Sequence, residues 1–250
     1  MKPLEISSSA NSQYKVWQSL LSSKGIKEHQ QFFLMGLKLV EEFLLRPQKK
    51  FKIEYVLFHQ LPSFETTAKT TILSRDLFKE LDVLGTNSPL LVLSFQAFAA
   101  KEIEKNPEGL EIICPLGDPR NLGALIRSAV GFCAREMILT QESTHPFLPH
   151  SLKASAGAAL AMNFSVIKEK LAHLPLIGEN FALELHGTNL SKVQWPKNLR
   201  LWVGEEGPGL GLTHEQKRLM QFIHIPTSGI ESLNATISAT LALWEWKKSN

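Results

Sequence analysis

The fold of the chain is decided by residues 225–246, which read IPTSGIESLNATISATLALWEW. Ile225 ends a predicted strand, because Pro226 lacks the N–H that a sheet ladder needs. Small and polar residues then form a tight loop, and a predicted helix follows Ser232. The first N–H groups and the dipole of this helix would point into a cleft, which suits a ligand. On spacing alone, an ordinary capped C-terminal helix is the simpler explanation.

The predicted helix has two different faces. Four apolar residues recur at the spacing of one helical face: Leu233, Ile237, Leu241 and Trp244. The other face carries small residues, which would let another backbone approach closely: Ala235, Thr236, Ala239 and Thr240.

Residues 225–234 resemble the third signature motif of the SpoU/TrmH branch of the SPOUT RNA methyltransferases, in which Ile-Pro and a short loop precede Ser-Leu-Asn and a helix. Two more motifs of that family precede it in the family's order. Residues 121–127, NLGALIR, match Asn-x-Gly-x-x-x-Arg, and residues 203–207, VGEEG, match the motif that ends in Glu-Gly. Three ordered motifs over residues 110–250 make the resemblance specific.

Short apolar strands alternate with helices in the second half, and the motif loops follow the C-terminal ends of strands. This pattern predicts an α/β fold with a parallel sheet. The resemblance implies that residues 107–250 form a SPOUT methyltransferase domain with a trefoil knot. Residues 1–106 are expected to form a small α/β domain that resembles certain RNA-binding ribosomal proteins. The polar residues 96–108 are expected to be the linker.

Local signals predict the individual elements. In the first half we expect helices over 14–23, from Gly36 and after the N-cap Ser74, with strands over 32–35, 52–58 and 90–95. In the second half we expect strands over 110–116, 136–140, 181–185 and 200–203, and a helix that begins at Lys153. Asn121 is the predicted N-cap of a helix that buries five residues: Leu122, Leu125, Ile126, Ala129 and Cys133.

Composition limits the compartment and the class of partner. The chain has 250 residues, 44% of them hydrophobic, and a net charge of +3. No apolar run is long enough for a membrane span, no secretion signal is visible at residues 1–13, and the two cysteines suggest neither a zinc site nor disulfides. We therefore expect a cytoplasmic protein. Residues 1–107 hold 14 Lys/Arg and 11 Asp/Glu, a surplus that fits both a polyanion-binding module and chance.

Arg127 and Lys153 are candidates for RNA contact. Arg127 lies off the predicted buried stripe, and Gly123 and Gly131 flank it one turn away on either side. This leaves room for a ribose-phosphate, although a solvated surface arginine explains the pattern equally well. Lys153 begins KASAG (residues 153–157), which matches a basic segment of the family, and it can contact phosphate or remain solvated. His145 and His150 lack further ligands, so we predict no metal site.

The glycines after the strand at residues 200–203 have two interpretations. A dinucleotide loop would need the full Gly-x-Gly-x-x-Gly spacing, which is absent. Glu205 and Glu206 would repel a pyrophosphate, and Pro208 removes an N–H that phosphates would use. A cationic cofactor without phosphate fits better, and S-adenosylmethionine, a sulfonium, is such a molecule.

The resemblance implies transfer of the sulfonium methyl group to a ribose 2′-hydroxyl of RNA. It assigns catalytic roles to Arg127, Asn121, Glu206, Ser232 and Asn234. It assigns the cofactor to the loops that contain Thr188, Gly204, Gly209, Ile225 and Leu233.

The resemblance also implies a homodimer that acts on RNA. The N-terminal domain favours large-subunit ribosomal RNA, and the alternative is a tRNA 2′-O-methyltransferase. A non-catalytic RNA-binding relative is disfavoured, because Asn121, Arg127, Glu206 and Asn234 are all present. An enzyme of another nucleotide-binding class is disfavoured by the acidic loop.

Overall fold

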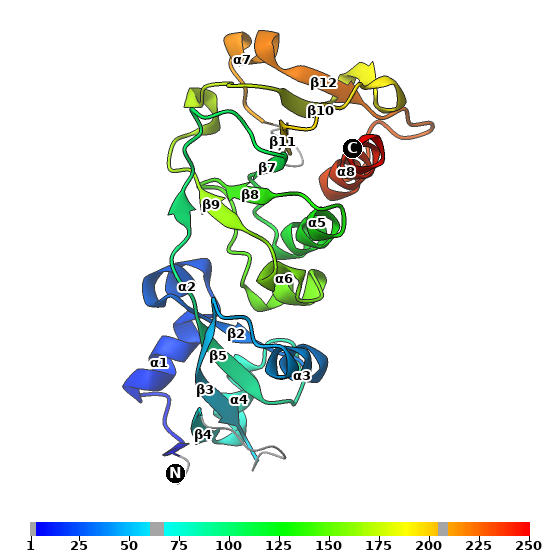
Figure 1. Ribbon diagram of the computed structural model, residues 1–250. Helices are drawn as coiled ribbons and strands as arrows, with labels where there is room; N and C mark the ends of the chain where they lie inside the picture. The colour runs from blue at the N-terminus through cyan, green and yellow to red at the C-terminus, as the bar shows by residue number, and fades with distance from the viewer. Residues whose placement is uncertain (1–3, 61–67, 205–209) are drawn as a thin grey trace. The chain divides into compact units, whose positions relative to one another are not determined.

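The computed structural model describes residues 4–60, 68–204 and 210–250. The chain divides into two compact units (Figure 1). Unit 1 comprises Met1–Ala97 and His145–Gly157, and unit 2 comprises Phe98–Thr144 and Ala158–Asn250. This division differs from the expected boundary after residue 106 in two respects. Residues 98–106 belong to unit 2, and a segment from the middle of the second half belongs to unit 1.

Unit 1 is built on a mixed five-stranded sheet with the order β1-β4-β3-β5-β2. Its strands are β1 (Leu4–Ile6), β2 (Gln31–Leu34), β3 (Lys52–Phe58), β4 (Lys69–Leu73) and β5 (Leu90–Ser94). Its helices are α1 (Ser12–Ser19), α2 (Ser23–His29), α3 (Leu37–Leu45), α4 (Arg75–Leu81) and α6 (Pro149–Ala154). The expected strands, the helix after Gly36 and the N-cap position of Ser74 are confirmed.

Two helix predictions in unit 1 were wrong. The helix expected over 14–23 is two helices, because Ser22 starts α2 by accepting a hydrogen bond from the N–H of Gly25 at 3.1 Å. The helix expected to begin at Lys153 instead ends there: α6 closes at Ala154, and Ala156 and Gly157 adopt left-handed backbone angles of φ +49° and +80°. A left-handed residue is a common end for a helix.

An aromatic cluster explains why residues 145–157 belong to unit 1. The ring of Phe147 stacks on that of Phe32 with centroids 4.4 Å apart, and it meets Phe95 and Phe51 edge-on at 5.0 and 5.6 Å. Phe147 is 2% exposed. Aromatic pairs of this kind add about 0.5–1.5 kcal/mol each beyond the burial of their area. The N–H of His145 also donates to the Ser23 hydroxyl at 2.9 Å.

Unit 2 contains a seven-stranded sheet with the order β12-β10-β11-β7-β8-β9-β6. Each neighbouring pair runs parallel, which confirms the predicted α/β class. The strands are β6 (Ala99–Ala100), β7 (Leu110–Cys114), β8 (Glu136–Leu139), β9 (Phe164–Val166), β10 (Asn180–Asn189), β11 (Leu199–Trp202) and β12 (Gln221–His224). The helices are α5 (Pro119–Gly131), α7 (His214–Leu219) and α8 (Ala235–Ser249), with short 3-10 turns η1 (Ala158–Leu160), η2 (Leu171–His173) and η3 (Leu190–Lys192).

The expected linker over 96–108 is largely part of unit 2. β6 pairs with β9, and an ion cluster holds the residues that follow. Arg200 is fully buried, and its guanidinium donates to the Glu111 carboxylate at 2.9 Å and to the carbonyls of Ile103 and Lys105 at 2.9 and 2.5 Å. The ammonium of Lys101 lies 2.6 Å from Glu111. Charged side chains therefore attach this segment to the sheet.

α8 packs on α5 through its small-residue face. The Thr236 hydroxyl donates to the Asn121 carbonyl at 3.2 Å, and the Thr240 hydroxyl donates to that of Ser128 at 2.9 Å. Two residues of the apolar stripe are instead exposed, Ile237 at 53% and Trp244 at 50%, whereas Leu233 and Leu241 are half-buried. The small residues therefore allow the backbone of α5, in the same chain, to approach α8 closely. Among the described residues, no helix has the length and apolar character to cross a membrane.

Candidate functional site

A cavity of about 450 Å³ opens in unit 2 where β10, β11 and β12 end and α8 begins. Its described lining comes from three stretches: residues 183–185 of β10, residues 203, 204 and 210 after β11, and residues 223–238 between β12 and the first turn of α8. Ligand sites in open parallel sheets form outside the carboxyl ends of the strands. The position and size of the cavity therefore suit a small-molecule ligand.

An irregularity in β10 makes one wall of this cavity. Leu183 and Thr188 both register with Ile223 of β12, so the residues between them bulge out of the ladder. Gly187 lies where the bulge returns to the sheet, and a Cβ there would be only 2.4 Å from the Phe222 carbonyl oxygen. Only glycine permits this approach. The bulge presents Glu184 and Leu185 to the cavity.

Some of the cofactor residues predicted from the sequence line this cavity, and others do not or lie outside the described residues. Gly204, Ile225 and Leu233 line the cavity, as does Ser232, which was predicted to be catalytic. Thr188 lies opposite Ile223, a lining residue, but does not itself line the cavity. Glu206 and Gly209 lie outside the described residues, so the structure places neither of them.

Asn121 was expected to cap α5, and this prediction was wrong. The cap is Asp118, whose carboxylate accepts hydrogen bonds from the N–H groups of Arg120 and Asn121 at 2.8 and 2.9 Å. Pro119 occupies the first turn, where its missing N–H costs nothing. Asn121 is half-buried, and its carbonyl accepts the bond from Thr236. This bond joins the first motif to the start of α8.

Asn234 is the N-cap of α8. Its side-chain oxygen accepts hydrogen bonds from the N–H groups of Thr236 and Ile237 at 2.9 and 3.3 Å. The helix therefore begins at Ala235 rather than directly after Ser232, and Ser232 remains in the exposed loop that precedes it. Asn234, which was predicted to be catalytic, thus has a structural role: it caps α8 and orients the first turn of that helix at the cavity.

Arg127 is exposed on α5, away from the buried stripe formed by Leu122, Leu125, Ile126 and Ala129. Cys133 does not belong to that stripe, which corrects the expectation: it is exposed and lies beyond the helix with φ +60°. Open space surrounds Gly131. Lys153 is exposed on α6 in unit 1.

Sequence reasoning missed several lining residues, among them Glu184, His224, Thr227 and Glu231. The signal was available for two of them, since Glu184 lies near the end of the strand expected over 181–185 and His224 ends β12. The lining contains two carboxylates and no Lys or Arg among the described residues, which favours a neutral or cationic ligand over a phosphate. No group of three or more potential metal ligands occurs in the described ranges.

Comparison with known proteins assigns the chain to a family. The model of the SpoU rRNA Methylase family matches residues 112–244. The chain is 33% identical to ribosomal RNA small subunit methyltransferase G 2 of Syntrophobacter fumaroxidans, over 98% of this chain and 49% of that protein. It is 24% identical to the 23S rRNA (guanosine(2553)-2′-O)-methyltransferase RlmP of Bacillus subtilis, over 96% of this chain and 98% of that protein.

A solved structure shows the same fold: the SpoU methyltransferase AviRb from Streptomyces viridochromogenes, in complex with the cofactor AdoMet. Its TM-score is 0.77 at 19% identity, over 95% of this chain and 97% of that chain. The chain spans about half the length of the first relatives it matches. Because the family model covers more than half of the sequence, including all three motif regions, the chain belongs to the SpoU rRNA methylase family.

Proposed function

We propose that the chain is an S-adenosylmethionine-dependent methyltransferase that modifies a ribose 2′-hydroxyl in large-subunit ribosomal RNA. One observation carries the proposal: parts of all three family motifs converge in unit 2. Gly204 of the second motif and Ile225 and Leu233 of the third line one cavity. The carbonyl of Asn121, in the first motif, accepts a hydrogen bond from Thr236 at the start of α8.

The cavity fits the proposed cofactor in charge and in size. S-adenosylmethionine supplies an electrophilic methyl group on a sulfonium. Glu184 and Glu231 line the cavity and favour a cation. Leu183, Leu210 and Leu233 offer apolar walls for a flat heterocycle, and the hydroxyls of Thr227 and Ser232 offer polar contacts. This mixture of apolar walls and a few polar groups is typical of cofactor sites.

Arg127 is the residue that we assign to the RNA. Its guanidinium keeps its proton at neutral pH, so it anchors the phosphate beside the target ribose and stabilises the alkoxide as charge develops. Bound S-adenosylmethionine would supply its methyl group to the 2′-oxygen, and its sulfur would leave as a neutral thioether. The hydroxyl proton passes to that phosphate or to a nearby hydroxyl. Asn121 and Glu206 orient the ribose and Arg127, and Ser232 and Asn234 hold the acceptor nucleotide.

The remaining assignments rest on charge, exposure and the relatives. Unit 1 carries 13 Lys/Arg and 9 Asp/Glu, which supports RNA binding, including at Lys153. The exposed Ile237 and Trp244 on α8 support a homodimer through this helix, which sedimentation of the purified chain tests. The names of the 23S rRNA methyltransferase relatives support a ribosomal target. We also propose that the chain is knotted and that the protein is cytoplasmic.

The deciding experiment is transfer of labelled methyl groups to separated, unmodified ribosomal and transfer RNAs, followed by nucleoside mapping. We expect label in a 2′-O-methyl nucleoside of 23S RNA. Arg127→Ala should abolish transfer and leave the melting temperature unchanged, because the side chain is exposed. Arg218→Ala, an exposed arginine on α7 away from the cavity, is the matched control. Label in transfer RNA, or near-normal turnover of Arg127→Ala, would contradict the corresponding part of the proposal.

A further inference from the structure

Unit 1 contains a groove of its own, with a volume of about 360 Å³. Three stretches line it: the turn from β2 into α3 with that helix as far as Glu42, the loop between α4 and β5, and the end of α6. Residues from all three belong to unit 1. The proposed function uses one of its residues, Lys153, as an RNA contact, and assigns no role to the others.

The groove is held in shape by contacts of its own walls. The buried carboxylate of Asp82 accepts hydrogen bonds from the Thr86 hydroxyl at 3.0 Å and from the N–H of Asn87 at 2.7 Å, which fixes the loop before β5. Gly36 adopts φ +95°, a conformation that disfavours other residues, and a Cβ there would lie 3.9 Å from the Thr86 methyl group. The site is therefore preformed rather than dependent on a rearrangement.

The walls are mostly aliphatic and partly open to solvent. Met35, on one side of the groove, is buried, whereas Leu37 at the start of α3 is 54% exposed. Leu39 and Leu84 complete the apolar lining. A flat ring with apolar faces can cover these side chains.

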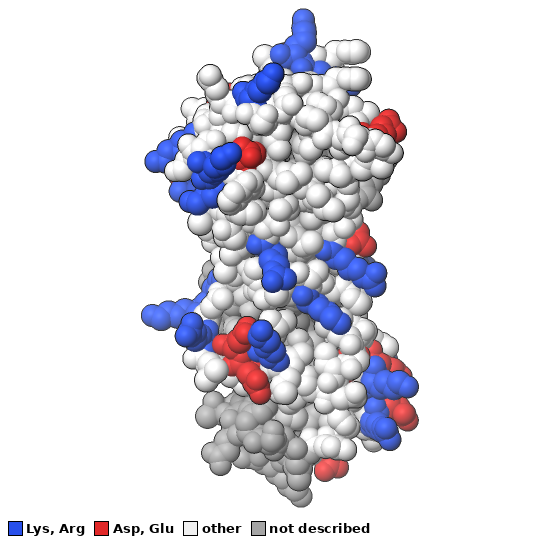
Figure 2. Space-filling view, turned by 90° about the vertical axis from the view of Figure 1, so that its right-hand side faces the viewer, with Lys and Arg blue, Asp and Glu red and all other residues white. Residues whose placement is uncertain are grey.

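Positive charge borders the apolar walls. The exposed Lys153 lines the groove from α6, and the side chain of Lys38 is 88% exposed. Glu42, the one carboxylate among the described lining residues, lies 3.9 Å from Lys38, so the two cations outnumber it. Figure 2 shows Lys and Arg side chains at several places on one face of the molecule, with Asp and Glu side chains among them. An apolar pocket with two cations at its rim complements a base flanked by phosphates. A lipid tail or an apolar peptide would use the walls but not the lysines.

We propose that this groove receives one unstacked nucleobase of a single-stranded RNA segment, whose flanking phosphates contact Lys38 and Lys153. The base must be unstacked, because a base inside a duplex has both faces covered. The inference rests on the proposed function in requiring an RNA substrate, and it adds a second point of recognition in unit 1. The groove would contribute to substrate affinity and not to methyl transfer itself.

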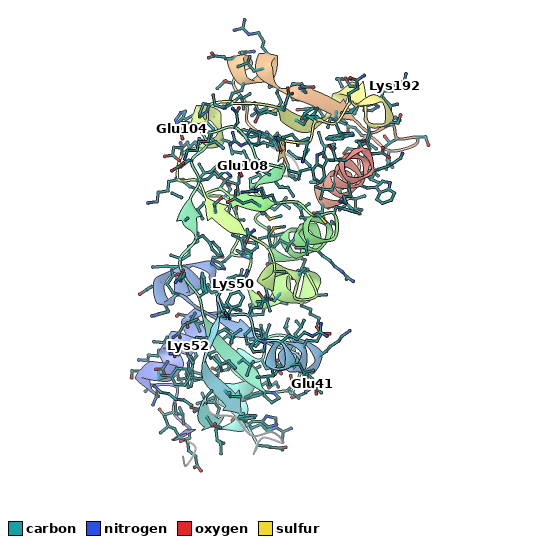
Figure 3. All side chains as sticks on the ribbon, viewed as in Figure 1. Glu41, Lys50, Lys52, Glu104, Glu108 and Lys192 are labelled. Carbon is teal, nitrogen blue, oxygen red and sulfur yellow. The ribbon has the colours of Figure 1, made fainter. Side chains whose placement is uncertain are left out.

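The test compares matched variants of the full chain. Leu37→Ser removes the exposed wall, and Leu45→Ser removes an 81% exposed leucine at the far end of the same helix, outside the groove. Lys38→Ala is matched by Lys52→Ala, a lysine of β3 labelled in Figure 3 that pairs with Glu54 and does not line the groove. The probes are in vitro transcribed 23S ribosomal RNA and a single-stranded RNA of mixed sequence that contains 4-thiouridine.

We expect Leu37→Ser to weaken RNA binding by roughly 3- to 12-fold, because the base would cover the exposed half of this leucine, with KM for RNA raised and kcat unchanged. Lys38→Ala should reduce the salt dependence of binding by about one phosphate contact. The controls should match the wild type, and crosslinked 4-thiouridine should map to residues 35–39, 84–86 or 153–156. Wild-type levels of RNA binding in Leu37→Ser, or crosslinks only elsewhere, would overturn this inference alone. Absence of RNA binding and methyl transfer in the wild-type chain would overturn both it and the proposed function.

Discussion

Asn234→Ala should destabilise unit 2 by about 1 kcal/mol, because it removes the cap of α8. The Asn234 side-chain oxygen accepts two backbone hydrogen bonds, at 2.9 and 3.3 Å, from N–H groups that have no partner within the helix. Loss of an asparagine cap to alanine costs about 0.5–2 kcal/mol. For a domain of this size that corresponds to a fall of roughly 2–4 °C in the melting temperature per kcal/mol, which calorimetry resolves.

The variant Asn234→Asp distinguishes the capping of α8 from the proposed contact with the acceptor nucleotide. A carboxylate keeps the acceptor and suits the positive end of the helix dipole, so the melting temperature should stay within about 1 °C of the wild type. If the amide also holds the acceptor nucleotide, as we propose, a carboxylate that cannot donate and repels phosphate should lower kcat by about 10²-fold or more. Single-turnover methyl transfer at saturating RNA measures this loss.

Asn11 provides a control with the same geometry. Its side-chain oxygen caps α1 by accepting from the N–H groups of Gln13 and Tyr14 at 2.9 and 3.1 Å, in unit 1. Asn11→Ala should cost a similar free energy of unfolding and leave kcat unchanged. The capping argument fails if Asn234→Ala melts like the wild type. The proposed contact with the nucleotide fails if Asn234→Asp transfers methyl groups at the normal rate.

Two further predictions concern buried charges. Arg200→Met should lower the free energy of unfolding of unit 2 by about 3–5 kcal/mol in urea titrations, because it breaks the buried pair with Glu111; a change below 1 kcal/mol would contradict this. Burial, with a smaller contribution from Lys27, lowers the pKa of His145 to about 3, so only the unfolded chain binds this proton between pH 6.5 and 3. The free energy of unfolding of unit 1 should therefore decrease as the pH is lowered across that window, by roughly 4–5 kcal/mol in total. An identical pH dependence in His145→Phe would show that His145 is not the group responsible.

The strands were predictable because their signals are local. Alternation over 52–58 and the apolar runs before the motif loops require no knowledge of distant partners. The assignment of residues 145–157 to unit 1 depends on Phe147 meeting Phe32 and Phe95, which lie far away in the sequence. No local pattern encodes that choice. The same holds for β6, whose two alanines become a strand only because β9 lies beside them.

The cap of α5 shows a signal that was present and misinterpreted. Asp118 and Asn121 are both good N-cap residues, and the family motif drew attention to Asn121. Pro119 decides between them, because proline is favoured in the first helical turn directly after the cap. A helix that started after Asn121 would have left Pro119 in the loop and Asp118 without its two N–H donors. Gly204, Ile225 and Leu233, which the motifs had singled out, line one cavity.

Helix α8 shows why periodicity alone cannot say which face of a helix is buried. Its buried residues include the small Ala239 and Ala242 together with Leu243 and Trp246. Thr236 and Thr240 find hydrogen-bond partners on α5. This packing places Asn234 and Asn121 at the same end of the helix pair. It also leaves Ile237 and Trp244 exposed, at a cost that a second copy of the chain would remove by covering them. The packing that assembles the proposed site therefore creates the surface that we assign to the dimer.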